Sequence, residues 1–169
     1  QQTINKSITS IVDLVDDPPD VMIITVKANA LPLIASAIEG FHREGIYVVS
    51  WQNGIDTELE LAKTLGTRSV MRAVVNYGCG LVGPAHVNMP FHHPPHFIQE
   101  LDAVSGPAAR AIAEALSRSG LTPEPPDHIV AMGWRTSIRN ASLSPVCAVR
   151  GCSLAPARWE RCVGEWVAV

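Results

Sequence analysis

The chain has 169 residues and a mass of 18.2 kDa, the size of one ordinary domain or slightly more. Apolar residues make up 47% of the sequence and charged residues 17%, a balance that excludes a disordered chain and a membrane span. The formal net charge of -3 leaves no broad cationic surface, so we expect no nucleic-acid partner and no membrane partner.

The cysteine pattern favours reduced thiols and a cytoplasmic location. The cysteines occur singly, without a CxxC pair or zinc-finger spacing: Cys79, Cys147, Cys152 and Cys162. No basic-then-apolar leader opens the sequence. A metal or disulfide role for Cys147 and Cys152 is the less favoured alternative, because cysteines in helices usually fill cores.

Strand and helix patterns alternate through the first 120 residues. Apolar, β-branched runs predict strands over 21–26, 46–51 and 69–77, the first of them buried on both faces of a parallel sheet. Helical periodicity predicts helices over 29–41, 56–65 and 106–120. A strand, a helix and a further strand predict a right-handed crossover. We therefore expect an α/β fold with a partial Rossmann-type parallel sheet and flanking helices.

The rest of the chain changes character twice. Glycines and prolines over 78–95 predict turns and short edge strands, and the three prolines within 122–127 predict a linker or a short extended piece. From residue 127 onward, one long helix is expected, broken or kinked near Pro145. We infer a partial Rossmann-like domain over 1–122 and the start of an all-helical C-terminal domain over 127–169. The tail from Ser153 has no clear pattern.

Two residues stand where open α/β sheets bind ligands, outside the carboxyl ends of predicted strands. Lys27 follows the first strand and Asn53 follows the second, so we expect them to be neighbours at one edge of the sheet. The alternatives are a solvated surface charge and a simple Asn-Gly turn.

Other motifs are weaker. The pattern GxGxxG occurs over 78–83, but the following residues, PAHVNMPFHHPP, cannot open the helix that a phosphate-binding loop needs. A histidine cluster invites a metal hypothesis, yet a proline- and histidine-rich loop is more often irregular surface: His86, His92, His93 and His96. No nucleophile elbow and no P-loop is present.

Four blocks together carry a family resemblance: ThrValLysAla at 25–28, TrpGlnAsnGly at 51–54, AsnTyrGly and then ValGlyProAlaHisVal between 76 and 87, and TrpArg with Asn140 at 134–140. Their order and spacing resemble ketopantoate reductase over about residues 8–155. Any single block would be weak.

The resemblance implies an NADPH-dependent enzyme that reduces 2-dehydropantoate to pantoate, on the route to pantothenate and coenzyme A. It implies a Rossmann-type domain followed by a helical domain, NADP as cofactor and a small 2-oxo acid as substrate, and it allows a homo-oligomer. By the same resemblance, Lys27 and Asn53 are catalytic and cofactor-binding residues, and Asn140 binds substrate.

Three departures from the family pattern suggest impaired activity. The family's glycine-rich loop would precede Gln1, and most of its helical domain would follow the last residue, so the start and end of the sequence look cut. Thr136 stands where the family has its general-acid lysine, and a hydroxyl is too weak an acid to replace it. Arg135 or Arg139 is a less favoured electrostatic substitute. The alternative function is a non-catalytic fragment or relative that acts as an interaction module.

Overall fold

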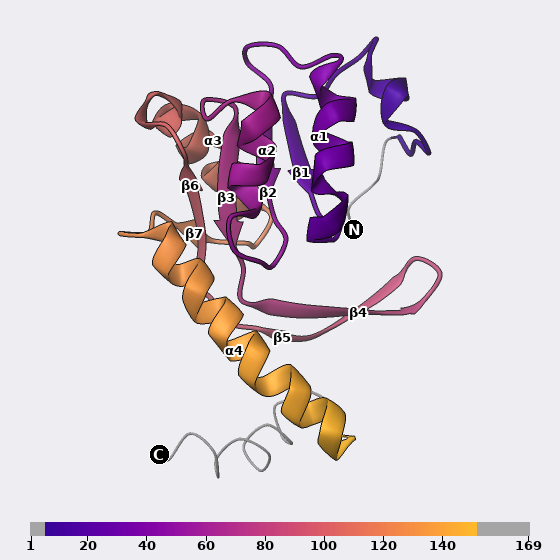
Figure 1. Ribbon diagram of the computed structural model, residues 1–169, viewed down its shortest axis with the longest axis vertical. Helices are drawn as coiled ribbons and strands as arrows, with labels where there is room; N and C mark the ends of the chain where they lie inside the picture. Colours follow the sequence, from indigo (N-terminus) through magenta and orange to yellow (C-terminus); the bar gives the residue numbers. More distant parts are fainter. Residues whose placement is uncertain (1–5, 152–169) are drawn as a thin grey trace.

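The computed structural model describes residues 6–151. A five-stranded sheet with helices on both faces forms its main body, and a two-stranded hairpin and a long helix extend from one end (Figure 1). The strands are β1 (Val21–Ile24), β2 (Tyr47–Ser50), β3 (Val70–Val74), β4 (Tyr77–Gly83), β5 (His86–His92), β6 (His96–Glu100) and β7 (Pro123–Glu124). The helices are α1 (Leu31–Glu39), α2 (Thr57–Leu65), α3 (Gly106–Arg118) and α4 (Ile129–Arg150), with short 3-10 turns η1 (Ile11–Leu14), η2 (Ala28–Ala30) and η3 (Ala103–Ser105).

The order of the main sheet is β1-β2-β3-β6-β7. The first three strands are parallel neighbours, with Ile24 opposite Ser50 and Ser50 opposite Arg72. β6 runs antiparallel to β3, and β7 runs parallel to β6. The carboxyl ends of β1, β2 and β3 therefore lie at one edge of the sheet, the same edge at which β6 begins.

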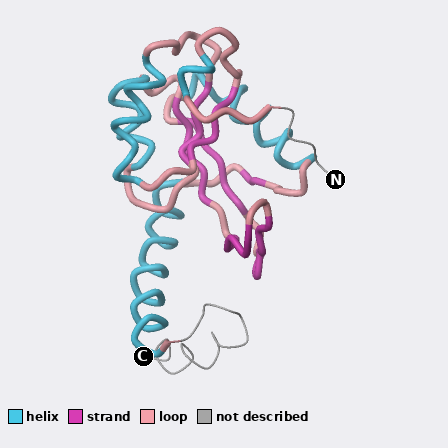
Figure 2. Tube along the Cα trace, turned by 90° about the vertical axis from the view of Figure 1, so that its right-hand side faces the viewer, coloured by secondary structure: helices cyan, strands magenta, loops and turns pink. Residues whose placement is uncertain are grey.

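Two apolar cores lie on the two faces of the sheet. Helices α1 and α2 cover one face and α3 covers the other, and Figure 2 shows the sheet from the side with helices on both faces. The first core combines side chains of β1 and β2 with helix residues such as Leu31, Ile38 and Leu61. The second joins strand residues Val49, Met71, Ala73 and Ile98 to Ala109 and Ile112 of α3. This layering confirms the expected α/β architecture.

The first three predicted helices are present, with bounds one or two residues shorter. Pro32 and Pro107 stand in the first turns of α1 and α3, where a missing backbone N–H costs no intrahelical hydrogen bond. Gly66 ends α2, and Gly120 follows α3 with a φ of +89°. The helix ends were therefore predictable from residues with special backbone preferences.

The first predicted strand is not buried on both faces, contrary to expectation. Met22 and Ile24 are buried against α1, but Ile23 on the opposite face is 43% exposed. The reason is that α3, the helix on that face, packs against β6 rather than against β1. Among the described strands, β1 has only β2 as a neighbour and is therefore an edge strand.

The glycine- and proline-rich region differs from its prediction. Instead of turns and short edge strands, residues 77–92 form a hairpin of two seven-residue strands, β4 and β5, with register shifts beside Gly78 and Leu81. The predicted third strand over 69–77 ends at Val74, and Tyr77 begins this hairpin. β6 was not predicted, because His96 and the polar residues that follow Ile98 interrupt its apolar pattern.

The end of the described range differs from expectation in one respect. Residues 123–124 of the expected linker form β7, a short extended piece that extends the sheet. The expected long helix is present as α4, but the helix runs unbroken through Pro145. The predicted break is therefore wrong, and the alternative of a kink near Pro145 stays a prediction. A proline removes one intrahelical N–H, and the adjacent turns hold this helix together.

Some expectations fall outside the described residues: those for Cys152, for Cys162 and for the tail over 153–169. Within 6–151, Cys79 is exposed and Cys147 is buried, and both are free thiols. No helix within these residues has the length and apolar character to cross a bilayer.

Candidate functional site

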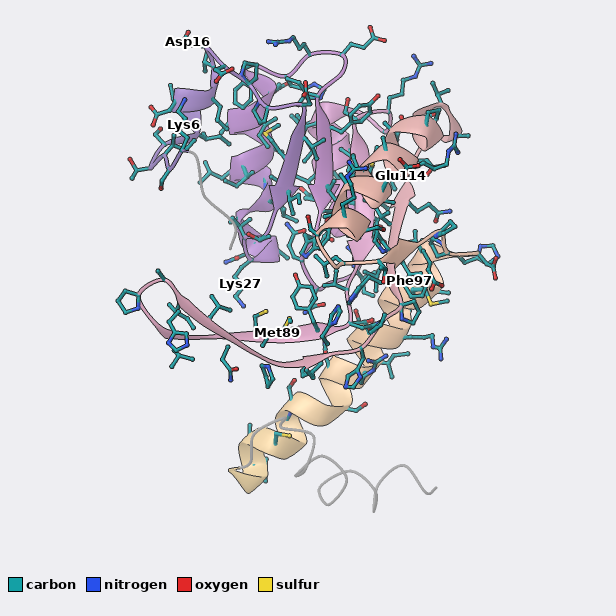
Figure 3. All side chains as sticks on the ribbon, turned by 180° about the vertical axis from the view of Figure 1, so that it is seen from behind. Lys6, Asp16, Lys27, Met89, Phe97 and Glu114 are labelled. Carbon is teal, nitrogen blue, oxygen red and sulfur yellow. The ribbon has the colours of Figure 1, made fainter. Side chains whose placement is uncertain are left out.

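Lys27 and Asn53 occupy matching positions on neighbouring parallel strands. Ile24 of β1 pairs with Ser50 of β2, and each candidate lies three residues beyond its member of this pair. Adjacent strands lie about 4.8 Å apart. Both candidate side chains are exposed, and Figure 3 shows Lys27 projecting beyond the end of β1 towards the side of the sheet where the hairpin lies. The carboxyl ends of β1 and β2 are therefore followed by an exposed lysine and an exposed asparagine.

Asn53 belongs to a tight segment, residues 52–56, which we call the 52–56 turn. Gly54 has a φ of +138°, and a Cβ built there would lie 2.8 Å from the Thr57 Cγ2. Only glycine fits this position. Asp56 is left-handed, with a φ of 57°, and its side chain makes no capping hydrogen bond to α2 although it occupies the N-cap position. The turn is therefore held by other contacts.

Those contacts come from a buried charged pair beneath the turn. Arg72 of β3 donates from Nη1 to the Glu58 Oε2 at 2.7 Å and also to the Thr57 hydroxyl, while its Nη2 donates to the Gly54 carbonyl oxygen at 2.8 Å. The Arg72 and Glu58 side chains are 5% and 6% exposed. One guanidinium thus connects β3, the start of α2 and the 52–56 turn.

A chain of hydroxyl groups extends this network to Gln52. The Ser50 hydroxyl donates to the Gln52 Oε1 at 2.8 Å, and it also shares a hydrogen bond of 2.9 Å with the Thr57 hydroxyl. All three side chains are buried, and the Gln52 Nε2 has no hydrogen-bond partner among the described residues. Hydrogen bonds therefore orient the polar side chains at the end of β2, and the Gln52 Nε2 is the donor that they leave unpaired.

Helix α4 meets the other side of this network. A small pocket lies between the turn and the first two turns of α4, and its lining includes Gly54, Arg72, Gly133 and Trp134. Asn140 does not line this pocket: it is exposed on α4, seven residues after Gly133, or about 10 Å along the helix axis. The structure thus places Lys27 and Asn53 beyond the carboxyl ends of neighbouring strands and Asn140 further along α4.

Aromatic and histidine contacts tie the hairpin to the same edge. The Trp51 Nε1 donates to the Tyr77 hydroxyl at 2.7 Å, and the Tyr77 ring meets His96 edge-on. The His96 Nδ1 accepts the Asn76 backbone N–H at 3.0 Å, and its Nε2 lies 2.7 Å from the His92 Nε2. The base of the hairpin is therefore hydrogen-bonded to the sheet.

These contacts also define the protonation of His96. Because its Nδ1 accepts a hydrogen bond, the neutral ring carries its proton on Nε2 and donates to His92. Burial, and then the neighbouring His92, lower the pKa of His96 below its ordinary value. A ring with Nε2 protonated offers no lone pair to a metal ion. Within residues 6–151, no group of three potential ligands is placed to hold one.

The glycine motif over 78–83 lies along β4. A phosphate-binding loop must lead into a helix, and β4 leads through a turn into β5. The expectation that no helix follows this motif is confirmed.

Sequence reasoning missed the residues that support the turn: Ser50, Thr57, Glu58 and Arg72. A signal was present, because Arg72 stands in an otherwise apolar strand, and a charge buried in a sheet needs a partner. The sequence did not indicate that the partner would come from the start of α2.

The sequence of the chain matches a known protein family. The family model described as Ketopantoate reductase PanE/ApbA matches residues 1–99, more than half of the 169-residue chain. The chain belongs to the ketopantoate reductase family. The resemblance inferred from the four sequence blocks is therefore confirmed, and members of this family are oxidoreductases. No curated protein matches the chain at a significant level.

Solved structures agree with the family and with the Rossmann-like fold. A protein described as a ketopantoate reductase from Ralstonia solanacearum is 27% identical, with a TM-score of 0.62 over 78% of this chain and 47% of its own. D-mandelate dehydrogenase, solved with NADH and anilino(oxo)acetate, is 26% identical, with a TM-score of 0.69 over 76% and 41%. A 2-dehydropantoate 2-reductase from Geobacter metallireducens shares the fold at 20% identity, with a TM-score of 0.68 over 79% and 44%. The chain spans less than half the length of each of these three proteins.

Proposed function

We propose that this chain takes part in the NADPH-dependent reduction of a 2-oxo acid, 2-dehydropantoate to pantoate. Lys27 and Asn53 are its catalytic and cofactor-binding residues, and Asn140 binds substrate. The observation that carries the proposal is the placement of Lys27 and Asn53, each three residues past the Ile24 and Ser50 pair, in a chain of this family. The cytoplasmic location and a homo-oligomer stay predictions.

The chemistry of the two side chains suits such a substrate. A 2-oxo acid carries a carboxylate beside a ketone, and the Lys27 ammonium attracts the negative charge of the first group. The Asn53 amide offers donors and an acceptor in one plane, which can orient the ketone or a ribose hydroxyl. The strands fix the spacing of both groups, so their contribution is orientation for hydride transfer.

The described residues fit one end of a nicotinamide cofactor better than the other. The cofactor, when bound, supplies the hydride. Lys27 and Asn53 suit its nicotinamide end, beside the substrate. The pyrophosphate needs a glycine-rich turn that opens a helix, and within residues 6–151 the glycine motif over 78–83 forms a strand instead. We therefore assign only the nicotinamide end to these residues.

The proton that completes ketone reduction has no strong donor at the expected position. Thr136 on α4 is half-buried and carries a hydroxyl in place of the family's ammonium. Arg135 and Arg139 on the same helix are exposed and always charged, so they can stabilise an oxyanion but cannot release a proton. We therefore expect slow turnover, and faster turnover in the Thr136→Lys variant.

Substrate binding tests the proposal independently of turnover. Ligand-observed NMR with 2-dehydropantoate should show binding to the full chain that falls about tenfold or more in Lys27→Met. The matched control is Lys63→Met, which removes an exposed lysine paired with Glu60 on α2 and should bind as the parent does. Parallel titrations with NADPH and NADH test the cofactor preference. Equal binding by both variants would contradict the assignment of Lys27.

A second candidate function rests on the surface of α4. Val130, Trp134 and Ile138 recur every four residues, and their side chains are 56%, 51% and 60% exposed. Exposed apolar stripes of this kind mark interaction surfaces. A protein that acts only as an interaction module would need these exposed residues and would not need a general-acid lysine in place of Thr136. Light scattering tests self-association through this surface. A chain that stays monomeric at all concentrations, measured without 2-oxo acid present, would count against self-association as its function.

A further inference from the structure

Arg72 is an unusual occupant of its strand. β3 is buried along its whole length, and its other residues are three aliphatic or alanine side chains and Met71. Its guanidinium donates hydrogen bonds to three groups: the Glu58 carboxylate, the Thr57 hydroxyl and the Gly54 carbonyl oxygen. Arginine presents its donors in a rigid planar fork, so three acceptors on one guanidinium are also fixed relative to one another.

Stability alone does not account for this arrangement. Burying a charged pair costs desolvation energy that the attraction between the charges only partly offsets, and well-packed apolar residues often serve as well or better. The pair of Arg72 and Glu58 has a geometric result that an apolar pair cannot reproduce. It holds the carbonyl of Gly54, the residue directly after Asn53.

Arg72 also lies where the two parts of the candidate site meet. The pocket that it lines has the 52–56 turn on one side and Gly133 of α4 on the other. A Cβ built on Gly133 would lie 3.6 Å from the Arg72 Nη2, so the helix backbone rests close to the guanidinium. The same nitrogen donates to Gly54. The Arg72 side chain therefore lies between the turn that carries Asn53 and the helix that carries Asn140, and it sets the distance between them.

We propose that Arg72 is a positioning residue: by holding the Gly54 carbonyl from the buried Glu58 pair, it fixes the turn that presents Asn53 and seats α4 against it. The effect on catalysis rests on the proposed function of Asn53. The restraint on the turn does not, and it can be measured without substrate.

Asn53 itself provides the measurement. In an Asn-Gly sequence, the Gly54 backbone nitrogen can attack the Asn53 side-chain carbon, form a succinimide ring and release ammonia. Water then opens the ring to aspartate or isoaspartate. Ring closure requires rotation about the Asn53 Cα–C bond, which turns the Asn53–Gly54 peptide. The Arg72 hydrogen bond to the Gly54 carbonyl holds the next peptide of the same turn in place, and so opposes that rotation. The rate of deamidation therefore reports how firmly the turn is held.

Two variants separate the restraint from the charge pair. Arg72→Lys keeps a positive charge near Glu58 but has no second nitrogen in place of Nη2, the atom that donates to the Gly54 carbonyl oxygen. The double variant Arg72→Met with Glu58→Met removes both charges and leaves no unpaired buried ion, which protects against a failure to fold. The control is Ile112→Val on α3, in the core on the opposite face of the sheet, which lowers stability without touching the turn.

Full-length chains are incubated at neutral pH, and mass spectrometry follows deamidation at Asn53 while thermal unfolding follows the fold. Hydrogen bonds to charged groups are strong enough that losing one should speed deamidation roughly tenfold or more in both Arg72 variants. Ile112→Val should deamidate at the parent rate. Folded Arg72 variants that deamidate at the parent rate would overturn the proposal, and so would equal acceleration in Ile112→Val.

The same variants keep this inference distinct from the proposed function. If the parent binds 2-dehydropantoate, folded Arg72→Lys should turn over more slowly with little change in KM, because binding is retained while Asn53 is less well oriented. If the parent binds no 2-oxo acid, the proposed function fails, and the deamidation rates still decide whether Arg72 restrains the turn.

Discussion

The 52–56 turn and the β4–β5 hairpin leave the same edge of one sheet, and they are held in opposite ways. Beneath the turn lies a buried charged network centred on Arg72 and Glu58. The hairpin extends away from the body, and its contacts with the sheet include the hydrogen bond between His92 and His96 and the hydrogen bond that the Tyr77 hydroxyl accepts from Trp51. Much of its apolar surface is exposed, including Leu81 and Val87 among others. The hairpin contact includes His96, whose pKa is lowered by burial and by His92, so the anchoring of the hairpin depends on pH.

The difference has a functional reading. A group that orients a reacting ketone must be held closely, and the turn that carries Asn53 is held from a buried charged pair. A segment that adapts to a neighbouring surface needs less restraint, and the hairpin has few contacts with the core. Variants in each region test this division, from the largest expected effect to the smallest.

Removing one partner of the buried pair should have the largest effect. Glu58→Leu leaves the Arg72 guanidinium buried without a counter-charge, which should lower the free energy of unfolding by about 3–5 kcal/mol. Urea unfolding followed by circular dichroism measures the change. Glu60→Leu is the matched control on the same helix, because its pair with Lys63 is exposed and contributes well under about 1 kcal/mol. Similar losses in both variants would show that the buried pair is not the main restraint.

Adding a methyl group to a glycine should distinguish the two regions next. Gly54→Ala introduces a Cβ that would lie 2.8 Å from the Thr57 Cγ2, at a φ of +138°, and should cost about 1–3 kcal/mol. Gly80→Ala in β4 meets no atom within 4 Å and should change the free energy of unfolding by under about 1 kcal/mol. The same urea experiment tests both. A larger loss in the hairpin variant would contradict this account.

The pH dependence should belong to the hairpin side. Burial lowers the pKa of His96 in the folded chain below its ordinary value of 6.5, so the fold favours the neutral ring. The stability that this provides is complete above pH 6.5 and is lost as the pH falls through the lowered pKa. The urea midpoint should therefore decrease on acidification below this value, and the decrease should be smaller in His96→Gln.

The histidine beside this pair provides the control. His93 stacks on Phe91 and has no hydrogen bond to His96, so His93→Gln should keep the parent's pH dependence. The titratable rings next to His96 are His92, stacked at 4.8 Å between centroids, and Tyr77, edge-on at 5.9 Å. If the His93 and His96 variants lose the pH dependence equally, the assignment to the His92 and His96 pair is wrong.

Much of the sheet's parallel half could be predicted from the sequence, because continuous apolar runs and helix-ending residues have local causes. The pattern around 21–24 and the stop at Gly66 are examples. The exposed face of β1 was not predictable, because it depends on where α3 packs. The hairpin was missed because glycine-rich residues can pair as strands when a partner of suitable register follows.

The candidate site divides in the same way. Lys27 and Asn53 could be located from the rule that ligands bind beyond strand ends, which needs only the strand order. The support beneath Asn53 joins residues separated by 14 to 18 positions, such as Arg72 with Glu58 and with Gly54. Such contacts depend on the register of β3 against β2, and no local pattern specifies that register.

The edge position of β1 has a consequence for handling the protein. Along one side of this strand, the described residues provide no partner strand, so its backbone amides and carbonyls on that side are open to pairing. A second extended peptide could form a ladder of hydrogen bonds there, and the outward-facing Ile23 would add apolar contact. Concentrated solutions should therefore favour strand addition at β1, and a lysine placed at Ile23 should keep the molecules apart.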